Sequence, residues 1–312
     1  MLKKAFCIFF SSEPCIIVLQ IQKERMIMIH YIENDWLRVG VKEYGCELTS
    51  VYSKKADYEY LWQGDESVWY GQSPILFPIV GRLIDDKYRL NGKEYEMPKH
   101  GFARKMEWRL LDEEDGIMAF ILSETEDTLA RYPYRFDLIV TFLLEDNRLK
   151  VTHTVVNKNE EVMYFSFGAH PGFNCAIGDR LVFDEPETLA TEKIDLVRSL
   201  RLPEKLPCLD NERAITITKD IFNEDALILH GIRSRHITLE SDRHDRTVRF
   251  DMGGSPYLGI WAKPGAPYVC IEPWFGVNDS TEQKNDFSEK EGIQSIAPND
   301  IFNCVWEAEF SH

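Results

Sequence analysis

Hydrophobic and polar residues alternate with a period of two along most of the chain from Tyr31 onward. Such alternation is typical of strands with one buried and one exposed face. Two alternating runs, 87–90 and 93–97, flank Asn91-Gly92, and Asn-Gly predicts a hairpin because a type I′ turn needs positive φ at both positions. Similar runs predict strands at 36–41, 47–52, 106–111, 117–123, 137–144, 148–156, 162–167, 226–230, 235–241, 247–252, 258–262, 268–272 and 303–310.

Helical signals are short, at 127–131 and 282–284, and an acidic turn is predicted at 112–116. Many strands without alternating helices are typical of a sandwich or barrel. The sequence therefore predicts an all-β fold, a large antiparallel β-sandwich. Neither an internal repeat nor a low-complexity linker divides residues 28–312, so we expect a single domain there.

Residues 1–27 differ in character from the rest of the chain. Their short apolar run is followed by no small-x-small cleavage site, which argues against a signal peptide. Lys23-Glu24 can be encoded by AAGGAG, which resembles a bacterial ribosome-binding sequence placed before Met28. We therefore expect an N-terminal extension from a mis-assigned start codon, with the protein beginning at Met26 or Met28. Removal of residues 1–27 should leave the melting temperature essentially unchanged.

Composition narrows the range of partners. The 52 acidic residues outnumber the 36 Lys and Arg, giving a formal net charge of −16 at pH 7. Such a surface repels nucleic acid and anionic lipid, so we expect neither as a partner, whereas a neutral sugar is indifferent to the charge. No apolar run approaches the roughly 20 residues of a membrane-spanning helix. The seven scattered cysteines form no CxxC pair, which is typical of single buried thiols in a cytoplasmic protein.

Two segments in the first third of the chain are unlike ordinary strands. Residues 74–82 form an apolar run with two prolines, which are excluded from a central strand and instead indicate a shaped loop ending at Arg82. Its guanidinium either makes a structural ion pair or binds sugar hydroxyls. His100 precedes a glycine in Lys99–Arg104, where the backbone can approach a ligand closely, although a surface or capping histidine fits the same pattern.

Two later segments place titratable groups at strand ends. His170 follows an apolar strand and precedes Pro-Gly, so its imidazole is either held at a rim or satisfied in the core. Glu272 ends the apolar run 268–271, where a carboxylate is either paired structurally or held for proton transfer. The adjacent Trp274 and Phe275 offer flat apolar surfaces on which a pyranose ring can stack.

Taken together, these segments resemble the aldose 1-epimerase family, specifically its LacX-like branch. The resemblance spans about residue 28 to the C-terminus and rests on four motifs in order: Phe-Pro-Ile-Val-Gly-Arg (77–82), His-Gly-Phe-Ala-Arg (100–104), Gly-Ala-His-Pro-Gly-Phe (168–173) and Ile-Glu-Pro-Trp-Phe-Gly (271–276). Each motif alone is weak, but four in this order are specific to the family. The resemblance implies an antiparallel β supersandwich that interconverts the α and β anomers of a hexose.

The resemblance also implies roles for individual residues. Glu272 matches the family's general base and His170 its general acid, while His100 and Arg82 match residues that orient the sugar. The family's sugar-binding aspartate has no clear motif here, and the candidates are Asp220 and Asp225. The reaction needs one ionised and one protonated group with pKa values near neutrality, and Glu and His meet that condition. No metal, nucleotide or other cofactor is required.

Other interpretations fit some of the same residues. A non-catalytic carbohydrate-binding or regulatory protein would have no use for an acid–base pair, and a glycoside hydrolase would need a second carboxylate. A metal isomerase would draw on His100, His170 and Glu272. The sugar is expected to be neutral, or phosphorylated with its phosphate on the basic cluster of Lys99, Arg104 and Lys105. Neither the particular sugar nor the oligomeric state follows from the sequence.

Overall fold

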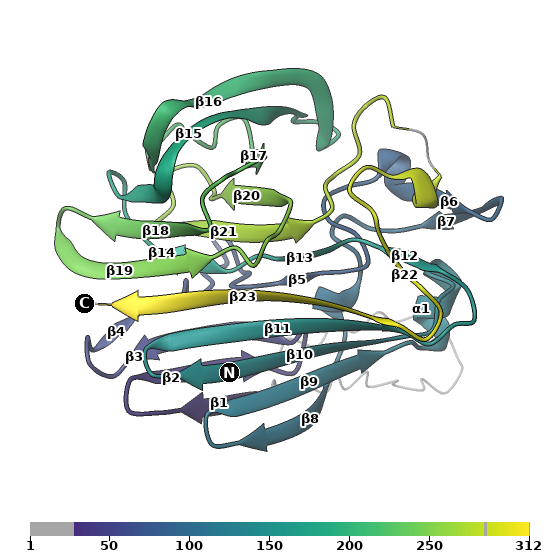
Figure 1. Ribbon diagram of the computed structural model, residues 1–312, viewed down its shortest axis with the longest axis horizontal. Coiled ribbons are helices and arrows are strands. Elements are labelled where there is room, and N and C mark those ends of the chain that lie inside the picture. The colour runs from purple at the N-terminus through teal and green to yellow at the C-terminus, as the bar shows by residue number, and fades with distance from the viewer. Residues whose placement is uncertain (1–27, 284–285, 312) are drawn as a thin grey trace, which may run out of the picture.

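The structure, a computed structural model, describes residues 28–283 and 286–311, so the prediction about residues 1–27 lies outside it. In the described ranges the chain forms antiparallel β-sheets, and α1 (Glu126–Arg131) is the one α-helix there (Figure 1). This confirms the predicted all-β class. Short 3₁₀ turns are η1 (Ile84–Asp86), η2 (Ala103–Lys105) and η3 (Phe287–Glu289). None of the described helices is long and apolar enough to cross a membrane.

The largest sheet has nine strands within the described residues, and every neighbouring pair in it is antiparallel. It supplies the broad lower layer and the arch at the top of Figure 1. In spatial order its strands are β16 (Leu200–Thr216), β15 (Arg180–Asp195), β18 (His236–Ser241), β19 (His244–Asp251), β23 (Ile301–Ser311), β11 (Arg148–Asn157), β10 (Phe136–Glu145), β9 (Ile117–Ser123) and β8 (Arg109–Glu114).

Two further sheets complete the sandwich. One contains β1 (Ile29–Glu33), β2 (Leu37–Lys42), β3 (Glu47–Ser53) and β4 (Tyr58–Glu59). The other contains β17 (Leu227–His230), β20 (Tyr257–Trp261), β21 (Tyr268–Phe275), β13 (Phe167–Ala169), β5 (Ile75–Leu76) and β14 (Gly172–Asn174), which also pairs with β21. Two small ribbons, β6 (Lys87–Leu90) with β7 (Lys93–Glu96) and β12 (Met163–Phe165) with β22 (Gln294–Ile296), lie at one end.

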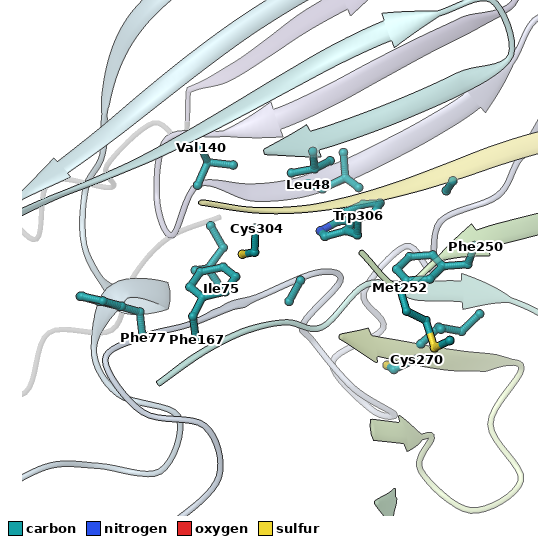
Figure 2. Close-up of a cluster of buried hydrophobic side chains, with 14 of the residues drawn as sticks. Leu48, Ile75, Phe77, Val140, Phe167, Phe250, Met252, Cys270, Cys304 and Trp306 are labelled. Carbon is teal, nitrogen blue, oxygen red and sulfur yellow. The ribbon is translucent and has the colours of Figure 1, made fainter. Parts of the chain in front are cut away.

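The hydrophobic core lies between the nine-stranded sheet and the two sheets that face it. Figure 2 shows side chains from β3, β5, β10, β13, β19 and β23 meeting there, including Leu48, Ile75, Val140, Phe167 and Trp306. All five are buried. Burying one such side chain contributes about 1.5–3 kcal/mol to the stability of the fold. The buried positions of the alternating strands therefore supply the rigid frame of the protein.

The predicted hairpin is present, whereas the predicted acidic turn is shorter than expected. Asn91 and Gly92 have φ of 51° and 76°, as the turn between β6 and β7 requires. The turn expected at 112–116 is wrong in extent because β8 continues to Glu114 and pairs with β9. The last three residues of β8 are exposed at the sheet edge, so no hydrophobic alternation marked them as strand.

The two longest strands of the structure, β15 and β16, were not predicted from the sequence. They form a hairpin that arches over the top of the molecule (Figure 1). Three prolines and many charged side chains interrupt their pattern. Proline is tolerated here because β16 is an edge strand, and because the β15–β16 register shifts around Pro186 and Pro207.

A buried arginine joins this hairpin to the segment that follows β21. Arg201 is 3% exposed; its Nε donates to the Asn278 carbonyl at 2.8 Å and its Nη atoms contact Glu291 at 3.1 and 2.6 Å. Beside it, the buried Lys290 ammonium pairs with Asp279 at 2.9 Å. These charge-assisted contacts hold the start of β16 against the chain just beyond β21.

Candidate active site

A pocket of about 480 Å³ lies between the six-stranded sheet and the β15–β16 hairpin. Its walls come from segments far apart in the chain. The lining residues are Trp69, Gly81, Lys99, His100, Arg104, His170, Ile194, Leu196, Phe222, Asn223, Asp225, Ala226, Ile228, Trp261, Pro264, Glu272, Trp274 and Asn278. The volume is suited to a small ligand, and histidine, carboxylate and indole groups converge on it.

A second groove, of about 740 Å³, lies beside Gly253 and Gly254 and offers less chemistry. Its lining includes no histidine. Its charged side chains are all paired: Arg235 with Asp251 at 2.7 Å, Lys150 with Glu307 at 3.5 Å, and Arg233 with Glu187 outside the groove at 3.6 Å. The smaller pocket is therefore the better candidate for an active site.

Strand pairing brings His170 and Glu272 together. Gly168 in β13 pairs with Trp274 in β21, so the residue that follows β13 lies beside the carboxyl group of β21. His170 Nε2 is 3.2 Å from Glu272 Oε2, and the same oxygen accepts a hydrogen bond from the Trp274 indole N–H at 3.1 Å. Glu272 is 1% exposed. The two sequence-predicted acid–base residues therefore form one close, buried pair.

Burial shifts the pKa values of Glu272 and His170 in opposite directions. It raises the pKa of the Glu272 carboxyl well above its usual range, while the Trp274 N–H and the Lys99 charge act against that rise. Burial also lowers the pKa of His170 to about 3. Both shifts favour the uncharged forms. Burial therefore opposes both the carboxylate form of Glu272 and the imidazolium form of His170.

A tight turn places His100 at the wall of the pocket. His100 and Gly101 both have positive φ, and a Cβ on Gly101 would lie 2.1 Å from the Phe77 carbonyl oxygen. The Gly81 N–H donates to His100 Nδ1 at 3.1 Å. Because Nδ1 accepts, the proton of the neutral imidazole resides on Nε2, which is then a donor. Burial lowers the pKa of His100 well below its usual value, so this tautomer stays neutral.

Two tryptophans that sequence analysis did not select form an aromatic wall. The Trp69 ring lies 5.2 Å from the His170 ring and 5.5 Å from the Trp261 ring. Tyr268 stacks behind Trp69 at 5.1 Å. Trp69 lies in a loop and Trp261 ends β20, and no local pattern distinguishes them from ordinary surface or core tryptophans.

Trp274 and Phe275 lie on opposite faces of β21. Trp274 lines the pocket beside Glu272, whereas Phe275 packs against Phe302 at 5.3 Å and does not line it. Alternate residues of a strand point to opposite faces, so position 274 shares the face of 272 and position 275 does not. That parity was available in the sequence and selects Trp274 as the pocket residue.

Of Arg82 and the two aspartate candidates, only Asp225 lines the pocket. Arg82 makes a bidentate ion pair with Asp86, at 2.7 and 2.6 Å, and does not line the pocket. Asp220 is exposed and also lies away from the lining. Asp225 lines the pocket, and its charge helps to raise the pKa of Glu272, which places it near the pair.

Two of the three residues in the basic cluster suggested by the sequence line the pocket. Lys99 and Arg104 line the pocket, whereas Lys105 is exposed and does not. An Arg104 Nη donates to the Lys99 carbonyl oxygen at 2.9 Å, and its buried Nε has no hydrogen-bond partner among the described residues.

Potential metal ligands at the site differ from the set that the sequence suggested. Nitrogen, sulfur and oxygen atoms of His170, Cys270 and Glu272 lie within 4.8 Å of one another, and His100 is not part of this group. Burial raises the pKa of the Cys270 thiol well above its usual value, so the thiolate that a metal prefers is disfavoured. Acid–base chemistry fits the pair without a metal.

Comparison with known proteins identifies the family to which this chain is similar. The sequence pattern of the family described as aldose 1-epimerase matches residues 28–291. The chromosomal LacX protein of Lactococcus lactis subsp. lactis is 32% identical over 284 residues, covering 86% of this chain and 95% of that protein. A galactose mutarotase related enzyme from Lactobacillus acidophilus has a TM-score of 0.86 at 30% identity, covering 91% of this chain and 98% of that one.

A second solved structure is similar to this chain to the same degree. The galactose mutarotase-like protein of Lactobacillus casei ATCC 334 also has a TM-score of 0.86 at 30% identity, covering 91% of this chain and 100% of that one. The match to the family pattern extends over most of the chain and includes all four motifs that carried the resemblance. The chain therefore belongs to the aldose 1-epimerase family.

Proposed function

We propose that the protein is an aldose 1-epimerase that interconverts the α and β anomers of a hexose. The buried His170–Glu272 pair, 3.2 Å apart in a pocket with an aromatic wall, carries the proposal. Anomer exchange needs one proton donor and one proton acceptor at neighbouring oxygens of the same sugar carbon. A carboxyl group and an imidazole at this distance suit that requirement.

The proposed reaction begins with ring opening. Glu272, as carboxylate, accepts the proton of O1 while His170, as imidazolium, donates a proton to O5. The C1–O5 bond breaks, an aldehyde forms at C1, and the C1–C2 bond rotates. Closure reverses the two proton transfers and delivers the other anomer. The Trp274 N–H and the Lys99 charge stabilise the carboxylate form, which opposes the burial that otherwise keeps the proton on Glu272.

Substrate positioning is assigned to groups around the pair. The Nε2–H of His100 donates to a sugar oxygen, and Asp225 accepts from sugar hydroxyls. Trp69 or Trp261 supplies the flat surface on which the pyranose ring packs. Arg82 is not assigned a direct contact, because its guanidinium is engaged by Asp86.

The aspartate assignment gives one testable prediction. Asp225→Asn should weaken sugar binding by at least about tenfold, the effect expected on losing a hydrogen bond to a charged acceptor. Asp220→Asn is the matched control, because Asp220 is exposed and lies away from the pocket. Titration calorimetry with a hexose measures both. Equal affinities for the two variants would remove Asp225 from the site.

The pH profile gives a second prediction. Activity should fall with rising pH as the His170–Glu272 pair loses its proton, because the proposed reaction needs an imidazolium at His170 as well as a carboxylate at Glu272. Trp274→Phe removes the N–H that lowers the pKa of Glu272, so that pKa rises further and the alkaline limb of kcat/KM should move to higher pH. Phe275→Leu, on the opposite face of β21, should leave the limb in place. An unshifted limb in Trp274→Phe would mean that Glu272 is not the titrating base.

The direct test of the function is a polarimetric screen of freshly dissolved α-sugars. We expect the protein to accelerate the drift of optical rotation for at least one hexose. Binding of a sugar without any acceleration would instead favour a non-catalytic carbohydrate-binding protein on the same fold.

A further inference from the structure

We infer that the pocket takes a sugar bearing an anionic substituent, a phosphate or a carboxylate, which is held by Arg104 and Lys99. The inference rests on the proposed function for the reaction, and it adds the substrate class. Its basis is that two cations line a small pocket and that neither is paired with a carboxylate of that lining.

Neither cation has an acidic partner among the described residues. No carboxylate there forms an ion pair with the half-buried Lys99 ammonium or Arg104 guanidinium, whereas the fully buried Arg201 and Lys290 are both paired with carboxylates. Glu47 is the carboxylate whose charge acts on Arg104. It already pairs with Lys42 and accepts the backbone N–H groups of Gln72 and Ser73.

The charge of the pocket also differs from the charge of the whole chain. Asp225 and Glu272 are the acidic residues of the pocket. Burial disfavours the charged forms of Glu272, His100 and His170, so Lys99 and Arg104 face Asp225 and a carboxyl group whose ionisation is opposed. The whole chain, by contrast, carries a formal net charge of −16. A local positive excess on so acidic a protein is a binding feature rather than a by-product of composition.

Partial burial explains why the Arg104 guanidinium favours an anionic ligand. Burial lowers the pKa of Arg104, so its charge is held at an energetic cost. A guanidinium matches the oxygens of a phosphate or carboxylate in a bidentate geometry, and Lys99 adds a point charge beside it. A neutral hydroxymethyl group at the same place would leave both charges uncompensated.

The experiment compares matched pairs of sugars. Mutarotation is followed by NMR exchange spectroscopy for glucose, galactose, their 6-phosphates and their uronates, with the wild type and three variants. Arg104→Met and Lys99→Met remove the pocket charges. Lys105→Met is the control, because Lys105 lies on the same turn but outside the pocket.

We expect the wild type to prefer at least one anionic sugar. The ratio of kcat/KM for that sugar to kcat/KM for its neutral parent should fall about tenfold to a hundredfold in Arg104→Met, the range expected for a charged hydrogen bond. Lys99→Met should lower the ratio in the same direction and Lys105→Met should not. The phosphate and uronate arms decide which anion is used.

Equal loss of the anionic and neutral sugars in Arg104→Met and Lys99→Met would overturn the inference, as would a wild-type preference for neutral sugars. Thermal melting of each variant identifies any that fail to fold, and the two pocket variants substitute for one another. If no sugar is mutarotated, titration calorimetry with hexose 6-phosphate and hexuronate decides the point. Arg104-dependent binding would then support the anion site while the epimerase proposal failed.

Discussion

Replacing Glu272 with glutamine is expected to lower the mutarotation rate by at least about a hundredfold, within the usual contribution of a positioned acid or base. The amide keeps the size of the side chain and can still contact the Trp274 N–H through its oxygen, but it has no basicity. Sugar binding should therefore survive the change. Polarimetry gives the rate and calorimetry gives the affinity.

His170→Asn and the double variant test whether the pair acts as a unit. The single change should cost as much as Glu272→Gln. The double variant should be little slower than either single one, because both groups serve one transfer sequence. Chelation with EDTA should leave the wild-type rate unchanged. Near-normal turnover by Glu272→Gln would mean that another group removes the O1 proton.

Gly101→Ala is expected to destabilise the protein by more than about 4 kcal/mol, far more than a methyl group added to an unobstructed glycine. The new Cβ would lie 2.1 Å from the Phe77 carbonyl oxygen, and the backbone there has φ of 69°. The obstructing atoms belong to the backbone of Phe77 and Pro78, so they cannot rotate away. Denaturant unfolding measures the loss, and any refolded variant should also lose the His100 contact with Gly81.

Gly92→Ala distinguishes the two causes of the stability loss expected in Gly101→Ala, namely backbone strain and the close approach to Phe77. Gly92 has a similar φ of 76°, but a Cβ there meets nothing within 4 Å. Only the backbone strain of about 1–2 kcal/mol should appear. Similar losses for the two variants would show that the left-handed backbone, and not the close approach to Phe77, sets the requirement for glycine.

The strands that the sequence predicted are those that bury one face. β9, β10 and β11 alternate regularly because one face of each packs on the core. β15 and β16 were missed because long stretches of the hairpin are exposed, so no hydrophobic signal accompanies their backbone pairing. Hydrogen bonding to a neighbouring strand leaves little trace in the side-chain pattern of a single sequence.

The candidate site was predictable only where local sequence constrains it. Glu272 and His170 stood out because charged or titratable groups end apolar strands, and the structure places them 3.2 Å apart. Trp69 and Trp261 reach the pocket through the tertiary arrangement of a loop and a strand end, which no local pattern encodes. Arg82 was singled out by its motif, but Asp86, four residues later, engages its guanidinium.

The β15–β16 hairpin forms part of the pocket wall but does not carry the proposed acid–base pair. Its turn, residues 196–199, brings Leu196 to the pocket wall and leaves Val197 89% exposed, while His170 and Glu272 lie on a different sheet. Arg201 fixes the hairpin from beyond the turn. Substitutions and insertions in these four residues can therefore change substrate range without disturbing the acid–base pair. The fold thus offers evolution, and protein engineering, a replaceable rim beside the proposed acid–base pair.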